Sequence, residues 1–291
     1  KLSQEKLDKC SEATGDKESL ASKSSQLKVL TAEKKLGEEK IEKALRAAAE
    51  ACKHALEDDQ AIIEEEVAYL QDEYDQYCED LIRCKSILEG GIVKWTDYQE
   101  LYQEALEWID KTEVAVKSFN KHKASTQEKR STLEEFQVKL QSIFDWQKEL
   151  DILNKKGQML LENCADSRVS NAVTQLTTKY QALLSLAKEV VRRLETQYQE
   201  HNQQDTLAND FKGWIKNTRD KLASQKNAEN THSELEEKLN GVREIRTMME
   251  QGQNKLRYLQ DLKERVIMHT ESSGVKAVED QVDALKKDFE N

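Results

Sequence analysis

The chain has 291 residues, a formal net charge of -11 and no proline, and 35% of its residues are charged. Because proline costs about 3 kcal/mol inside a helix, its absence and a total of only nine glycines indicate long, unbroken helices. The acidic balance argues against a nucleic-acid partner, and the lack of an 18-residue apolar run argues against a membrane span. We predict an all-α protein with no nucleic-acid partner and no membrane contact by this segment.

No residue pattern supports catalysis, a metal site or a cofactor. The five histidines are scattered, and the sequence contains no glycine-rich phosphate loop. The cysteines form no CxxC or CxxH pair, and they are Cys10, Cys52, Cys78, Cys84 and Cys164. Reduced thiols are the expected state of such cysteines. We therefore expect no enzyme activity, no metal and no cofactor.

The first predicted elements are a short helix over about Lys1–Thr14 and a long one over about Lys17–Leu56. The short helix reads as the remnant of an incomplete unit, and we expect it to fray. Within the long helix, the segment Ala44–Ala51 consists mostly of small residues, which bury little apolar area. We expect this first unit to be thin and less stable than the next, and open to completion by a neighbour or a partner.

The next predicted helix starts near Asp59 and contains the densest acidic cluster of the chain. Glu64, Glu65 and Glu66 follow the acidic run 57–59. Acidic residues are favoured at a helix start, so one interpretation is electrostatic and local. The other is a surface that receives a basic partner or a cation. An EF-hand is excluded because the calcium-loop pattern is missing.

This helix is predicted to continue to about residue 119 without a loop. Gly90 and Gly91 weaken it by about 1–2 kcal/mol relative to two alanines. They indicate either a hinge in this helix or a loss of helix stability that the fold tolerates. Trp95 follows closely, and packing at a joint is the expected role there, with a partner site as the alternative.

Beyond this helix the predicted loops are 123–127, 163–167, 227–231 and 270–274. The helix over 169–222 carries apolar residues at alternating steps of four and three. The members of this series are Val169, Val173, Leu176, Tyr180, Leu183, Ala187, Val190 and Leu194. A mean step of 3.5 residues is typical of helices packed in a left-handed bundle.

The whole pattern repeats at an offset of 106 residues. Trp108 maps onto Trp214 and Tyr74 onto Tyr180, and their heptad positions predict bundle cores. Trp146 maps instead onto a glycine, so it need not serve a shared core. The alternative that we consider is that Trp146 lies at a joint between units or on a partner surface.

Three antiparallel helices per unit, with continuous helices between units, predict tandem bundles in an elongated rod. The predicted units are 1–93 with an incomplete first helix, 94–200 complete, and 201–291 with a truncated third helix.

The paired tryptophans and tyrosines at this interval resemble the signature of the spectrin-repeat superfamily, and the resemblance covers the whole chain. The stretch from Asn163 to Leu184 further resembles the rods of the giant nesprins, which are nuclear-envelope proteins. That resemblance implies a cytoplasmic linker at the outer nuclear membrane, with actin-binding domains and a tail that meets SUN proteins in the LINC complex. Other giant spectrin-repeat proteins, such as plakins and dystrophin relatives, stay as alternatives.

Three functions follow from this reading. The first is a mechanical spacer whose surfaces dock cytoskeletal proteins between actin and the nuclear envelope. The second is a dedicated module that recruits one cytoskeletal regulator, such as a formin or a motor adaptor. The third is a dimeric coiled-coil tether, against which the regular loops argue, so we expect a monomer.

Overall fold

The computed structural model describes residues 2–12, 14–163, 167–224 and 231–291, and the expected loops over 163–167 and 227–231 lie mostly outside them. Over these ranges the chain is helical, as predicted. The helices are α1 (Leu2–Cys10), α2 (Lys17–Cys52), α3 (Glu57–Ser118), α4 (Thr126–Asp145), α5 (Gln147–Asn163), α6 (Ser167–Ser224), α7 (His232–Met268) and α8 (Ser272–Glu290).

Side-chain caps fix where several helices begin. The Asp16 carboxylate accepts a hydrogen bond from the Ser19 amide at 2.8 Å and starts α2. Ser125 and Glu128 form a reciprocal capping box that starts α4. Such caps satisfy amides that have no partner within the helix.

Two compact units make up the described chain. The first contains residues 1–109 and 147–180, and the second contains 110–146 and 181–291. Both α3 and α6 pass from one unit to the other as continuous helices, as predicted. The three-repeat boundaries inferred from the sequence stay a prediction.

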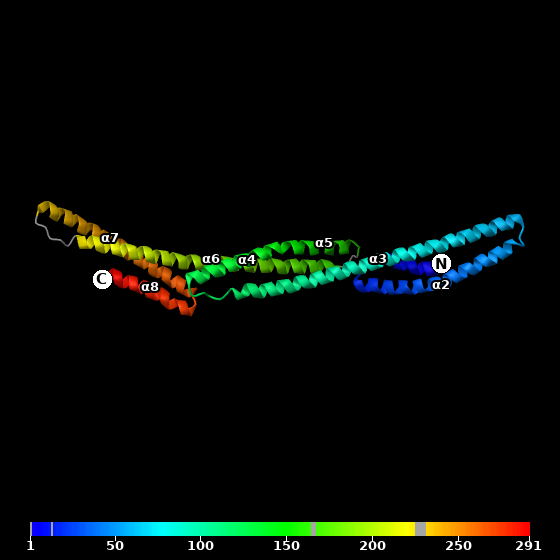
Figure 1. Cartoon of the computed structure of the whole chain (residues 1–291), viewed down its shortest axis with the longest axis horizontal. Coiled ribbons are helices and arrows are strands. Elements are labelled where there is room, and N and C mark those ends of the chain that lie inside the picture. The colour runs from blue at the N-terminus through cyan, green and yellow to red at the C-terminus, as the bar shows by residue number, and fades with distance from the viewer. Residues whose placement is uncertain (1, 13, 164–166, 225–230) are drawn as a thin grey trace. The chain divides into compact units, whose positions relative to one another are not determined.

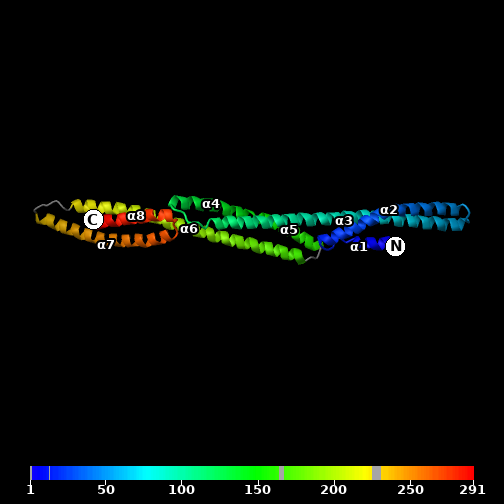
Figure 2. The same ribbon diagram turned by 90° about the horizontal axis from the view of Figure 1, so that it is seen from below.

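In the first unit, α2 runs back along α3, and α1 packs on α2 (Figures 1 and 2). Their buried apolar side chains are Leu7, Cys10, Leu20, Leu27, Leu30, Leu81, Cys84 and Leu88. The short α1 is therefore a packed helix, with Leu7 and Cys10 each only 1% exposed. Its burial opposes the fraying that we expected for this segment.

In the second unit, α7 and α8 lie alongside α6 (Figure 1). Phe211, Trp214 and Phe289 bring their rings together from α6 and α8, with centroids 5.7–6.0 Å apart. They pack with a buried core that consists of Ala208, Phe211, Ile215, Leu256, Leu259, Val282 and Leu285.

The heptad series predicted in α6 forms a buried stripe. Seven of its eight side chains are at most 4% exposed, and only Val173 is half-buried. Because the period of 3.5 residues keeps one face toward the neighbouring helices, this stripe stays inside along the helix.

Candidate docking site

The four aromatic residues predicted as core differ in burial. Tyr180 is fully buried, whereas Trp108 and Trp214 are half-buried. Tyr74 is also half-buried, and its hydroxyl donates a hydrogen bond to the Lys34 carbonyl at 3.0 Å. Only Tyr180 thus has the full burial of a core residue, and the core role of the other three stays a prediction.

Trp146 ends α4 and separates it from α5. Its amide donates a hydrogen bond to the Ser142 carbonyl at 3.2 Å, and its side chain is half-buried. We expected one continuous helix there. At its repeat-equivalent position, Gly252, an added Cβ would lie 2.4 Å from the Trp214 ring and 2.5 Å from the Phe289 ring. A larger residue at position 252 would therefore force these two rings to shift.

Gly90 and Gly91 lie inside α3, which continues through them without a break. Gly90 is exposed, and a Cβ added to it would meet nothing within 4 Å. The structure therefore has no packing reason for glycine at position 90, and a hinge stays a hypothesis.

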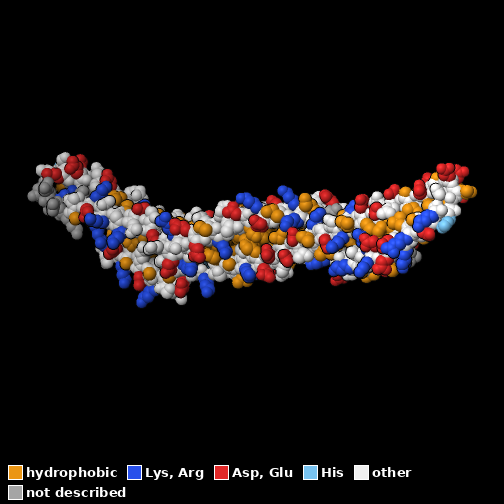
Figure 3. Space-filling view, turned by 45° about the vertical axis from the view of Figure 1, so that its right-hand side comes forward, with side chains coloured by type: hydrophobic (Ala, Val, Ile, Leu, Met, Phe, Trp, Pro, Cys, Tyr) orange, Lys and Arg blue, Asp and Glu red, His pale blue; other side chains and the backbone are white. Residues whose placement is uncertain are grey.

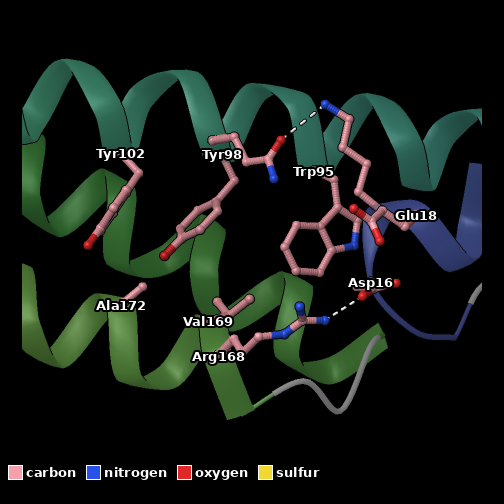
Figure 4. A pocket seen from close by; sticks show the side chains of 10 residues that line it. Asp16, Glu18, Trp95, Tyr98, Tyr102, Arg168, Val169 and Ala172 are labelled. Carbon is pink, nitrogen blue, oxygen red and sulfur yellow. Dashed lines mark hydrogen bonds and ion pairs between the residues drawn. The ribbon is translucent and has the colours of Figure 1, made fainter.

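Trp95 and Tyr98 lie in a joint of the first unit, where the start of α2, the middle of α3 and the start of α6 meet. They line a cavity of about 270 Å³ with Tyr102 and Val169 (Figure 4). Trp95 and Tyr98 are both buried, and neither the indole Nε1 nor the Tyr98 hydroxyl has a hydrogen-bond partner. Burial raises the pKa of Tyr98 to about 12.

Two polar contacts cross the mouth of this cavity. Lys17 Nζ donates a hydrogen bond to Gln99 Oε1 at 3.0 Å, and the Arg168 guanidinium pairs with the Asp16 carboxylate (Figure 4). The Ser19 amide, followed by Arg168, lowers the pKa of Asp16. Sequence analysis missed this ion pair because its partners lie far apart in the chain.

The second unit contains an equivalent joint 106 residues later. Trp95 maps onto His201 and Tyr98 onto Gln204, and both of these residues are buried. His201 Nδ1 and both amide atoms of Gln204 also lack a hydrogen-bond partner. The same two positions of the connecting helix therefore hold buried, unpaired polar atoms in both joints.

Charged groups surround this second joint, unlike the aromatic first one. Lys129 is 3% exposed, and its ammonium donates a hydrogen bond to Thr270 Oγ1 at 3.0 Å. Burial lowers the pKa of Lys129 to about 8, although Glu200 and Asp205 oppose the shift. Burial, and then the Lys129 cation, lower the pKa of His201. The 106-residue offset from Trp95 was the sequence signal that could have found this site.

Backbone atoms also meet at the second joint. The Glu271 amide donates a hydrogen bond to the Lys123 carbonyl at 3.2 Å. A Cβ added to Gly274 would lie 2.1 Å from the Ala124 carbonyl oxygen, so only glycine permits this approach. The predicted turn over 270–274 is real, although α8 already begins at Ser272.

The far halves of α2 and α3 form an exposed hairpin. No side chain from residue 31 to residue 80 is buried. Glu64, Glu65 and Glu66 are all exposed there. Large apolar side chains are open to solvent beside them, including Leu56 at 77% and Ile62 at 60% exposure. Figure 3 shows hydrophobic and acidic side chains together on the surface of the molecule. The sequence analysis anticipated an open first unit and a partner surface at Glu64, Glu65 and Glu66, and a docking role for this hairpin stays a prediction.

In the described ranges, no three His, Cys, Asp or Glu side chains are grouped so as to hold a metal ion. No helix among the described residues is apolar over a length that would cross a membrane.

The fold and its repeated joints define a protein built of tandem helical bundles. No family model matches the chain. It is 53% identical over 286 residues to the Drosophila melanogaster protein called muscle-specific protein 300 kDa, which covers 98% of this chain and 2% of that protein. It is 23% identical to mouse nesprin-3 over 248 residues, covering 85% of this chain and 25% of nesprin-3.

Human nesprin-3 is 22% identical over 211 residues, which cover 72% of this chain and 22% of the human protein. The chain thus spans a quarter or less of the length of each of these relatives. The chain is thus similar in sequence to nesprin-like proteins, and its fold is that of all-α helical-bundle repeats.

Proposed function

We propose that this chain is a segment of a cytoskeletal linker and acts as a mechanical spacer with docking surfaces on its repeats. The observation that supports the proposal is helix continuity. Helix α3 has 62 residues and α6 has 58, and each one enters two successive predicted repeats. At 1.5 Å per residue, α3 is about 93 Å long. A helix shared by two bundles couples their unfolding, as nearest-neighbour contacts do in repeat proteins.

The similarity to nesprin-3 supports a place for the parent protein on the cytoplasmic side of the nuclear envelope, between it and actin. In this proposal the segment sets distance and resists force, while protein partners bind its sides. A formin or a motor adaptor is a candidate partner under the same resemblance.

Stretching the 291-residue chain in an optical trap tests the spacer function. Gly90→Pro removes a helical hydrogen bond from α3 and costs about 3 kcal/mol. Gly90→Ala is the matched control, because its methyl group meets nothing and favours the helix. We expect the unaltered chain and Gly90→Ala to unfold the flanking repeats in one event.

For Gly90→Pro we expect two separate events, the first at a lower force. Separate events in the unaltered chain would contradict coupling through α3. An identical unfolding force for the Gly90→Pro and Gly90→Ala variants would also contradict this coupling.

A further inference from the structure

Three of the five histidines of the chain lie at the second joint, on segments that are far apart in the sequence. His122 lies in the loop between α3 and α4, His201 lies in α6, and His269 ends α7. The other two lie elsewhere, since His54 follows α2 and His232 begins α7. No histidine is among the described residues that line the cavity of the first joint. Because histidine gains its charge in mildly acidic solution, a fall in pH adds more charge to the second joint than to the first.

Backbone contacts at the second joint hold the α3–α4 loop against the α7–α8 turn (Figures 1 and 2). Lys123 and Thr270 form a parallel β-bridge, and the Glu271 amide donates a hydrogen bond to the Lys123 carbonyl at 3.2 Å. Gly274 packs directly on the backbone of Ala124. We call these three contacts the loop bridge. All of its residues belong to the second unit, and it links the second predicted repeat to the third.

His122 and His269 come immediately before the two residues of the β-bridge. Their imidazole rings lie with centroids 5.9 Å apart and planes tilted by 44°. The β-bridge fixes the backbone next to both rings, so the rings stay close as long as the loop bridge is closed. Protonation of both rings would therefore place two like charges side by side.

His201 lies at the same joint, with its imidazole buried near a buried cation. It is 4% exposed, and its Nδ1 has no hydrogen-bond partner among the described residues. The cation is Lys129, which donates a hydrogen bond to Oγ1 of Thr270 in the loop bridge. A proton on His201 would add a second buried positive charge beside Lys129, and burial penalises such a charge.

Other charged side chains do not compensate for these protons. The charged residues that lie in the two segments, bond to them, or act on His201 and its neighbours are Lys121, Lys123, Glu128, Lys129, Arg193, Glu200, Asp205, Arg265 and Glu271. Five of these are basic and four are acidic, so their balance of +1 would rise to +4 with three added protons. The two acids of α6 are already engaged, because Asp205 accepts a hydrogen bond from Thr126 at 2.5 Å and Glu200 pairs with Arg265 at 3.6 Å.

We propose that the second joint is a pH-sensitive connection, in which protonation of His122, His201 and His269 opens the loop bridge while the first joint stays closed. Opening lets the two rings of the loops separate and lets water reach the buried imidazole. Protons therefore bind the open form more readily than the closed form, and a fall in pH shifts the population toward it. Helix α6 still connects the two repeats, so the joint becomes more flexible and the chain stays continuous. In the linker proposed above, this makes the stiffness of one joint depend on pH.

Hydrogen–deuterium exchange of the 291-residue chain, read by peptide mass spectrometry, tests this proposal. Labelling is done at pH 7.4 and pH 5.5, with times scaled to the intrinsic exchange rate at each pH. We expect the protection of the amides over 270–274 to fall about tenfold at pH 5.5, because the loop bridge opens. The internal control is the segment 16–20 of the first joint, where Asp16 caps α2. Its protection should change less than about twofold, because no histidine acts there.

Histidine variants identify the groups that take up the protons. The triple variant His122→Gln, His201→Gln and His269→Gln should keep its protection over 270–274 within about twofold between the two pH values. The control is His54→Gln combined with His232→Gln, which removes two exposed imidazoles and should leave the tenfold fall unchanged.

A double variant avoids any change in the buried part of the joint. His122→Gln combined with His269→Gln leaves His201 in place and should reduce the fall to about threefold. His122 is exposed and His269 is half-buried, so circular dichroism at pH 7.4 should show the helix content of the unaltered chain.

A constant protection over 270–274 in the unaltered chain would overturn the proposal. A full tenfold fall in the triple or the double variant would overturn it as well, and so would an equal fall over 16–20, which indicates unfolding of the whole chain. The proposal goes beyond the spacer function. The optical-trap test of α3 depends on Gly90 and not on the loop bridge, so the two proposals can fail separately.

Discussion

At the level of single residues, equivalent positions of the two joints hold different residue types in different surroundings. Trp95 and His201 occupy equivalent positions of the connecting helices, and both are buried. In the first joint the surroundings are aromatic, with Tyr98 and Tyr102 nearby. In the second joint the buried Lys129 faces the site. Only the second joint therefore has a buried imidazole that responds to pH.

The response has a definite sign. The pKa of His201 is lowered below its usual 6.5, so the unfolded chain takes up a proton before the folded chain does. Stability is therefore complete above about pH 6.5 and falls as the pH drops through the interval between the unfolded and folded values. Protonation is unfavourable here because the imidazolium would be buried beside a cation.

We expect His201→Gln to flatten this part of the pH dependence. The free energy of unfolding, measured by urea denaturation at pH 7 and pH 5, should fall less in the variant than in the unaltered chain. His54→Gln changes an exposed histidine and serves as the control. An equal fall in His201→Gln and the unaltered chain would show that His201 does not contribute.

At the level of elements, helix α3 shows that one heptad pattern supports two degrees of burial. Leu81 and Leu88 are buried where α1 completes the bundle, and Val67 and Leu70 are not. The helix propensity and the seven-residue period of apolar positions are similar along α3. Burial is set by the number of helices that surround each turn.

Amide hydrogen exchange should follow this difference. We expect amides over 34–52 and 59–80 to exchange faster than those over 17–30 and 81–109, because opening the hairpin exposes less apolar surface. The comparison is internal, since each pair of segments belongs to the same helix. Uniform protection along α2 and α3 would mean that the two-helix hairpin is as stable as the three-helix region.

For the whole molecule, the expected oligomeric state is a monomer. Sedimentation equilibrium should give a mass near 33.6 kDa. The heptad stripe of α6 is buried within one chain from Val169 to Leu194, apart from the half-buried Val173, which argues against the dimeric coiled-coil tether. A mass of about twice that value, unchanged on dilution, would instead support the dimeric coiled-coil tether.

The sequence by itself determined the helical class, the 106-residue period and the long helices α3 and α6. These features depend on local properties, namely the absence of proline and the spacing of apolar residues along one helix face. The break at Trp146 escaped this reading because no proline or glycine marks it.

Tertiary structure decided which of the matching positions are buried. Glycine at 252 is explained by two rings from other helices, and glycine at 274 by a neighbouring backbone. Lys129 and His201 are buried together although they lie on different helices. Burial and proximity depend on how many helices meet around a position, and this number is not contained in the period of any single helix.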